Sequence, residues 1–108
     1  MKPFDIFIAY TSWGNEGKFR PVLVYTQNDN RVDAFSITTK YEIKSKAIQE
    51  KYFKINDWKQ SGLVKQSYID TNNKLNLPAI VFDAKNPIGQ LTESDKSRFL
   101  DFLNIVEE

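Results

Sequence analysis

The sequence predicts a mainly β protein, a small curled barrel that ends in one α-helix. Short runs of branched and aromatic residues recur between Ile6 and Phe82, and turn-forming residues separate them, as in small antiparallel domains. Apolar residues recur at helical spacing only after Pro87. With 108 residues and no linker-like segment, we expect one domain over residues 1–108, able to bury a core without disulfides or a structural metal.

The first strand is expected over Ile6–Tyr10, a short apolar run that follows Pro3. A polar loop with two glycines is expected next, over Thr11–Phe19, and it contains Trp13 and Glu16. Loops bear functional side chains more often than strands do. We expect Trp13 either to stack on a base of a nucleic acid or to cover the edge of the core.

A β-hairpin is expected over Gly17–Lys40. Pro21 has no N–H for a ladder, so we place it at the first residue of a strand that continues through Tyr25. The turn residues QNDN then lead into a second strand that ends at Thr38.

This hairpin is expected to bring Arg20 and Thr38 together. In an antiparallel hairpin the start of the first strand lies beside the end of the second, so both residues should share one rim of the sheet. A guanidinium beside a hydroxyl is suited to hold a phosphate. The sequence therefore predicts a phosphate site at this rim.

Three further strands are expected, over Tyr52–Ile55, Leu63–Ile69 and Leu75–Phe82. A turn at Asn72–Asn73 should separate the last two, and Pro78 favours a sheet edge for the last. Residues 40–51 predict a loop or a short helical turn, and Asn56–Gly62 predicts a single turn that the glycine ends.

The C-terminal helix is the clearest element. Thr92 with Asp95 three residues later fits a variant of the capping box. An apolar stripe follows at helical spacing and is expected to pack on the sheet; it consists of Phe99, Phe102, Leu103 and Val106.

The absence of histidine and cysteine restricts the possible chemistry. Without cysteine, a thiol nucleophile, a cysteine zinc site and a disulfide framework are excluded. Without histidine, serine–histidine triads, most transition-metal sites and RNA cleavage by paired histidines are excluded. We therefore expect no metal and no cofactor.

Charge is distributed unevenly. The net charge is +1, but residues 1–65 carry +4 and residues 66–108 carry −3. A polyanion can thus approach the N-terminal hairpin region. The start MKPFDIFIAY lacks the long apolar run of a secretory signal or a membrane span, so we expect a cytoplasmic protein.

Several stretches, in this order along the chain, resemble the MazF/PemK family of toxins from bacterial toxin–antitoxin pairs. They are Asp5–Ala9, Arg20–Pro21 followed by Val22–Val24, the strand end Ile37–Thr39, and, as in PemK-like members, Asp57–Leu63 and Ile88–Leu91. Together they span nearly the whole chain.

The resemblance implies an SH3-like barrel, a homodimer, and a metal-independent ribonuclease that cuts single-stranded RNA at short sequences. It also implies a cognate antitoxin that covers the active site. The arginine of the family's Arg-Pro motif falls on Arg20, its threonine or serine on Thr38, and the loop glutamate used by some members on Glu16. Residues expected to contact RNA around them are Trp13, Lys18, Thr39, Lys40 and Lys65.

Cleavage of RNA through its own 2′-hydroxyl requires a proton acceptor, a stabiliser for charge on the phosphorane and a proton for the leaving oxygen. In a chain without histidine, we assign Glu16 as the base, Arg20 as the electrostatic stabiliser and Thr38 as the hydroxyl that holds the phosphate. A guanidinium gives up its proton poorly, so stabilisation suits Arg20 better than acid catalysis.

Two other functions remain open for this sequence. Gyrase-poisoning toxins resemble the same barrel and act on a protein target through the terminal helix. A catalytically silent module would use the barrel only to hold RNA or a peptide.

Overall fold

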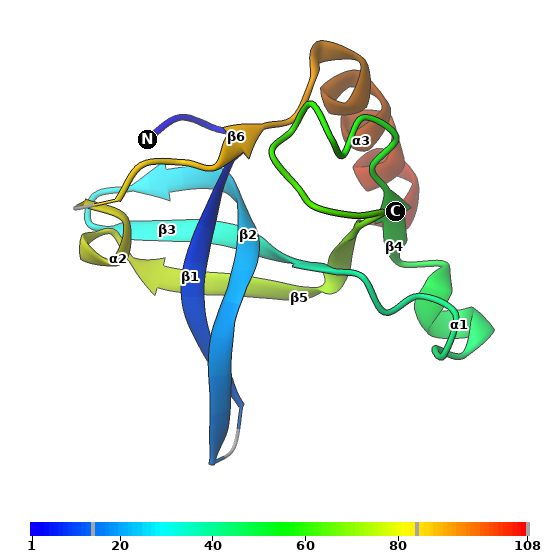
Figure 1. The fold of residues 1–108 in the computed structure, drawn as a ribbon, viewed down its shortest axis with the longest axis horizontal. Coiled ribbons are helices and arrows are strands. Elements are labelled where there is room, and N and C mark those ends of the chain that lie inside the picture. The colour runs from blue at the N-terminus through cyan, green and yellow to red at the C-terminus, as the bar shows by residue number, and fades with distance from the viewer. Residues whose placement is uncertain (14, 84, 108) are drawn as a thin grey trace.

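In the part of the chain that the structure describes, one curved antiparallel sheet is accompanied by three helices (Figure 1). The structure, a computed structural model, describes residues 1–13, 15–83 and 85–107, with Trp13 described by its backbone alone. The strands are β1 Asp5–Trp13, β2 Glu16–Asn28, β3 Arg31–Thr38, β4 Tyr52–Lys54, β5 Tyr68–Pro78 and β6 Gly89–Gln90. The helices are α1 Lys46–Gln49, α2 Ile80–Asp83 and α3 Glu93–Val106.

In the described part of the chain, the strand order is β4-β5-β3-β2-β1-β6, and neighbouring strands run antiparallel. The sheet curls into a half-barrel, with α3 against one end and the β1–β2 hairpin extending from the other (Figure 1). The predicted fold class, mainly β with a C-terminal helix, is confirmed.

Both faces of the sheet are buried near its centre. Successive residues of a strand point to opposite sides, so one strand contributes to both cores. In β2, Leu23 joins the larger core, whereas Val22 and Val24 join a second core on the other face. The larger core also contains Ile6, Phe35, Ile37, Phe53, Ile69, Phe99 and Leu103. The second contains Phe7, Ala9, Val32, Ala34, Ala79 and Phe82.

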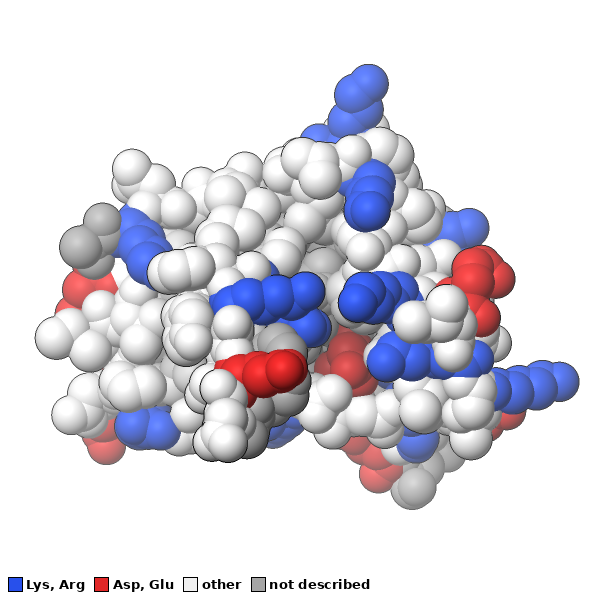
Figure 2. All heavy atoms as spheres, turned by 60° about the horizontal axis from the view of Figure 1, so that its bottom comes forward, with Lys and Arg blue, Asp and Glu red and all other residues white. Residues whose placement is uncertain are grey.

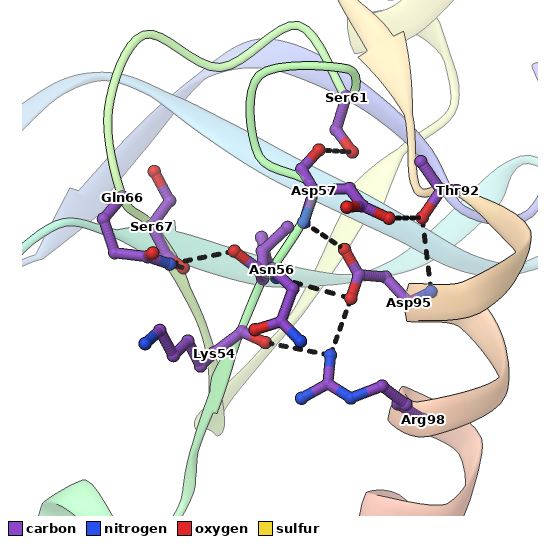
Figure 3. Close-up of polar contacts among 10 residues, drawn as sticks. Lys54, Asn56, Asp57, Ser61, Gln66, Ser67, Thr92, Asp95 and Arg98 are labelled. Atoms are coloured by element: carbon purple, nitrogen blue, oxygen red, sulfur yellow. Dashed lines mark hydrogen bonds and ion pairs between the residues drawn. The ribbon is translucent and has the colours of Figure 1, made fainter.

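The N-terminus of α3 is fastened to the segment after β4 by a buried carboxylate (Figure 3). Asp95 is fully buried, and it accepts N–H bonds from Asn56 at 3.3 Å and from Asp57 at 2.8 Å. The Arg98 guanidinium donates to the same carboxylate at 2.6 Å. The expected helix cap is confirmed, since the Thr92 hydroxyl accepts from the Asp95 N–H at 3.3 Å.

Two glycines let this segment lie against β6. Gly62 has a φ of +89°, the left-handed conformation that glycine adopts without strain. A side chain at Gly62 would collide with the Ile88 carbonyl, and one at Gly89 with the Ser61 carbonyl. The expected turn that ends at Gly62 is therefore present, and it packs directly on backbone.

The expected loop over Thr11–Phe19 is wrong. The β1–β2 ladder continues outward to the pair Trp13 and Glu16, so both strands extend well beyond the core. Pro21 consequently lies inside β2 and not at its first residue.

Pro21 determines where β2 and β3 separate. The Val24 carbonyl accepts from the Phe4 N–H at 2.7 Å, on the β1 side, so even-numbered residues of this part of β2 direct their backbone groups toward β1. Odd-numbered residues face β3. The β2–β3 ladder ends at Val22 and Ser36, one residue before the point where Pro21 would have to donate.

The second half of the chain differs from the sequence-based expectation at β5. Residues 63–67 form no strand, and residues 68–78 form one strand, β5, instead of two strands with a turn at Asn72–Asn73 between them. β5 has an irregularity where its pairing with β3 jumps from Lys74 to Asp70. Asp70 holds this bulge by accepting from the Asn72 N–H at 2.9 Å and the Asn73 amide at 2.7 Å. The strand ends at Pro78, and residues 80–83 form α2 instead of continuing it.

We expect Asp95→Ala to lower the free energy of unfolding by about 3 kcal/mol, because hydrogen bonds to a charged group contribute roughly 1.5–3 kcal/mol each. Urea unfolding followed by circular dichroism measures the change. Asp101→Ala, an exposed aspartate of the same helix, is the matched control and should change stability by less than about 0.5 kcal/mol. Equal losses in both variants would show that the Asp95 contacts do not fasten α3.

Candidate functional site

A cavity of about 190 Å³ lies where β2 and β3 separate. It is lined by residues from β2, from the end of β3 and from the segment before β5, among them Lys18, Phe19, Arg20, Thr38, Thr39 and Ser67. The open edge of β2 left by Pro21 therefore forms one wall of a cavity, and the departing end of β3 forms the opposite wall.

Arg20 and Thr38 lie on the same face of the sheet at this cavity. Val22 pairs with Ser36, and both strands continue two residues further to Arg20 and Thr38. Side chains two residues apart on a strand share a face, so the guanidinium and the hydroxyl both point to the face of Val22 and Ser36. The structure thus brings together the two residues that the hairpin pattern predicts.

Arg20 lines a second cavity as well. This cavity, of about 350 Å³, also has Thr11, Ser12, Ser36, Lys44 and Asn73 in its lining. Arg20 is only half-buried. Its side chain therefore borders both cavities, while the strand that carries it is paired with β1.

Thr38 is held by its own strand end and by β5. Its hydroxyl oxygen accepts the Lys40 N–H at 3.1 Å, and its Cα lies opposite that of Tyr68 in the β3–β5 ladder. A hydroxyl that accepts one hydrogen bond still has its own proton to donate. The Thr38 hydroxyl can therefore donate to an anionic oxygen in the cavity.

Three more residues lie on the face of Arg20 and Thr38. Asp70, which is buried, is opposite Ser36, Tyr68 is opposite Thr38, and Tyr52 is opposite Asp70. Burial raises the pKa of Tyr52, the charge and hydrogen bonding of Asp70 raise it further, and the positive charge of Arg20 lowers it. Burial also raises the pKa of Tyr68, with smaller contributions from Glu42 and Tyr41.

The raised pKa values of Tyr52 and Tyr68 make the free energy of unfolding depend on pH in the alkaline range. Folding raises both pKa values, so the folded state keeps the phenol protons at a pH where the unfolded chain loses them. The stabilisation is present below the ordinary tyrosine pKa of about 10 and is lost as the pH rises above it.

Only some of the other residues predicted to contact RNA line the cavity. Lys18 and Thr39 line the smaller cavity, and Lys40 adjoins it through its bond to Thr38. Lys65 is exposed and lies two residues before Ser67. The side chain of Trp13 lies outside the described structure, so its predicted contact with a base stays a prediction.

Glu16 lies at the outer end of β2, exposed, and lines neither cavity. It is four residues from Arg20, which on an extended strand corresponds to about 13 Å. Because both are even-numbered, Glu16 and Arg20 share a face of β2, yet the structure does not bring the carboxylate to the cavity.

Sequence reasoning missed Ser67, Ser36 and Asp70. Ser36 and Asp70 are buried polar residues inside strands, opposite one another in the β3–β5 ladder. The only local signal is a polar residue at an otherwise apolar position. Which strands would bring such residues to Arg20 depends on pairings that the sequence does not reveal.

The face that contains the end of the β1–β2 hairpin is rich in basic side chains. Figure 2 shows this face, with lysine and arginine side chains across its middle and toward the α1 side, and smaller acidic areas between them. The basic residues that line the two cavities are Lys18, Arg20 and Lys44. Such a distribution attracts an anionic ligand.

Among the described residues, there is no group of three or more acidic side chains arranged to hold a metal ion. No helix in the described part of the chain has the length and apolar character needed to cross a membrane.

The fold is similar to that of a known toxin. The structure of Mycobacterium tuberculosis toxin MazF-mt6 matches with a TM-score of 0.70 and 21% sequence identity, over 95% of this chain and 96% of that one. No protein-family model and no curated protein matches the sequence. The MazF-like fold implied by the sequence resemblance is therefore confirmed.

We expect Arg20→Ala to raise the pKa of Tyr52, because the substitution removes the positive charge that lowers it. Alkaline titration of tyrosinate absorbance measures this, with Tyr52→Phe identifying the signal. Arg31→Ala, at the other end of the hairpin, is the control and should leave the titration unchanged. An unchanged curve in Arg20→Ala would show that the guanidinium does not act on Tyr52.

Proposed function

We propose that this chain is the toxin of a toxin–antitoxin pair and cleaves single-stranded RNA, without a metal, at the cavity between β2 and β3. The observation that supports this proposal is the position of Arg20 and Thr38 on one face of one cavity, at the open edge of a strand in a MazF-like fold.

The arrangement suits binding of a phosphodiester. Arg20 presents a planar guanidinium that can donate two parallel hydrogen bonds to phosphate oxygens. Thr38 supplies a hydroxyl donor from the opposite wall. When the 2′-hydroxyl attacks the phosphorus, the bond from phosphorus to the 5′-oxygen breaks, which leaves a 2′,3′-cyclic phosphate and a 5′-hydroxyl that takes its proton from solvent. Negative charge grows on the non-bridging oxygens that these donors contact, so both interactions strengthen in the transition state.

Glu16, the candidate acceptor for the proton of the 2′-hydroxyl, does not line the cavity. For Glu16 to take the proton of the 2′-hydroxyl, the outer part of the hairpin would have to bend toward the cavity, since about 13 Å of strand separates it from Arg20. The proposal therefore rests on Arg20 and Thr38, with Glu16 as the candidate base.

Around this centre, we assign Lys18, Thr39, Lys40 and Lys65 to the RNA backbone, and Trp13 to a base. We further propose that the chain acts in the cytoplasm as a single domain over residues 1–108 and as a homodimer, and that its antitoxin covers the same cavity. Basic side chains on this face provide charge complementarity for RNA and for an acidic antitoxin segment.

Arg20→Ala should reduce RNA cleavage about a hundred- to a thousandfold, because removal of one preorganised donor for the developing charge typically costs on the order of 2.7–4 kcal/mol. The assay is incubation of a mixed-sequence RNA with purified protein in EDTA, read on a gel.

Arg31→Ala is the matched control for this assay. It removes an exposed arginine that bonds Asn76 at the far end of the same hairpin, and it should cut at the wild-type rate. Equal rates for Arg20→Ala and wild type would refute the proposed site. Loss of cleavage in Glu16→Gln would identify the base.

RNA affinity should fall linearly on a logarithmic plot against salt, with a slope of about −0.7 per phosphate contacted. Lys18→Ala should flatten the slope by about 0.7, whereas Lys96→Ala, on α3 and paired with Glu93, should leave it unchanged. Fluorescence anisotropy with a 2′-O-methyl RNA, which lacks the attacking hydroxyl, measures binding without cleavage. A flat salt response would contradict the binding of RNA through its phosphates.

A further inference from the structure

We propose that Phe19, supported by Tyr10, is a stacking site for a nucleobase of the RNA strand whose phosphate Arg20 and Thr38 hold. This inference rests on the proposed function. It adds to that function how the RNA strand is bound next to the reacting phosphate.

Phe19 and Tyr10 are unusually exposed. Their exposed fractions are 66% and 52%, and they are the only aromatic residues among the exposed large hydrophobic side chains of the described structure. The other aromatic residues whose side chains are described are at least half-buried. Two solvated rings side by side on a small domain indicate a binding surface more than a packing role.

The two rings are held in place by the hairpin. Tyr10 and Phe19 are direct partners in the β1–β2 ladder, and their ring centroids lie 5.4 Å apart at 71°, an edge-to-face contact. Any side chain at Gly17 would collide with the Tyr10 ring. Gly17 therefore provides the space in which Tyr10 lies across β2, and Tyr10 in turn supports Phe19.

Phe19 is adjacent to the proposed phosphate site. It directly precedes Arg20, and both line the cavity that also contains Thr38. Adjacent residues on a strand point to opposite faces, so the open edge of β2 offers the guanidinium on one side and the aromatic ring on the other. An RNA strand that crosses this edge would place its phosphate against Arg20 and a neighbouring base against Phe19.

The charges around the ring favour an anionic occupant. The Lys85 Nζ lies 5.6 Å from the centroid of the Phe19 ring and donates to the Ile8 carbonyl at 2.9 Å. Lys18, the residue before Phe19, lines the same cavity as Phe19. An apolar peptide gains nothing from these cations, whereas a nucleotide presents both a flat π face and a phosphate.

Stacking of this kind tolerates every base, because every base has a π face. The site should therefore contribute affinity and position the strand without selecting the sequence that is cut.

The test uses 2′-O-methyl RNA of mixed sequence in which 2-aminopurine, a base whose fluorescence is quenched by stacking, replaces single positions in turn. With wild-type protein, one or a few positions should be quenched on binding. In Phe19→Ala the quenching should disappear and the affinity should fall about 5- to 150-fold, as expected for the loss of one aromatic stacking partner.

Two comparisons separate stacking from a change of fold or charge. Phe19→Trp keeps an aromatic surface and should retain quenching and affinity. Ile80→Ala removes a similarly exposed apolar side chain from α2 and should behave as wild type. The salt slope of Phe19→Ala should equal that of the wild type, because no phosphate contact is removed.

Quenching and affinity in Phe19→Ala equal to those of Ile80→Ala would overturn the proposal. So would a wild-type dimer that Phe19→Ala converts to monomers in sedimentation, since the rings would then lie between two copies of the chain. If the wild type shows quenching that depends on Phe19 but cuts no RNA, the ribonuclease proposal fails and the stacking site stands. If it cuts RNA at the same rate and affinity without Phe19, only the stacking site fails.

Discussion

The missing hydrogen-bond donor of Pro21 determines where the sheet divides. β2 pairs with β1 along its first half and with β3 along its second, and only Val22 and Leu23 have partners on both sides. Any residue other than proline at position 21 would direct an N–H toward β3, and this donor would favour another ladder hydrogen bond beyond Ser36. The proline stops it there, so the same residue that shapes the half-barrel also opens the cavity beside Arg20.

The opposite wall of that cavity depends on the C-terminal helix. Asp95 holds the backbone of Asn56 and Asp57, and Ile55 just before them donates its N–H to the Ser67 carbonyl at 3.1 Å. The Gln66 side chain adds a bond to the Ile55 carbonyl at 2.8 Å (Figure 3). Ser67 lines the cavity. Hydrogen bonds at both ends of the short backbone segment 55–57 therefore connect the first turn of α3 with the cavity, although helix and cavity lining lie far apart in the chain.

Sequence patterns predict those elements whose signals lie close together in the chain. The capped helix, the β2–β3 hairpin and the meeting of Arg20 with Thr38 follow from a capping residue, turn residues and antiparallel pairing. The extension of β1 and β2 was missed because Thr11 and Ser12 pair with Lys18 and Gly17 outside the core, where strands need no apolar alternation. The β5 bulge was predicted as a turn because the Asn72–Asn73 signal is local, whereas the continuation of the strand on both sides of it depends on pairing with β3.

The unpaired edge of β2 also exposes the protein to a hazard that has nothing to do with RNA. A strand edge with free backbone groups can template the addition of a strand from another molecule, which leads to aggregation. This edge is poorly suited to such pairing, because Lys18 places a charge on it and Pro21 interrupts its donors. The same two residues that border this cavity would thus also hinder edge-to-edge pairing between copies of the free chain.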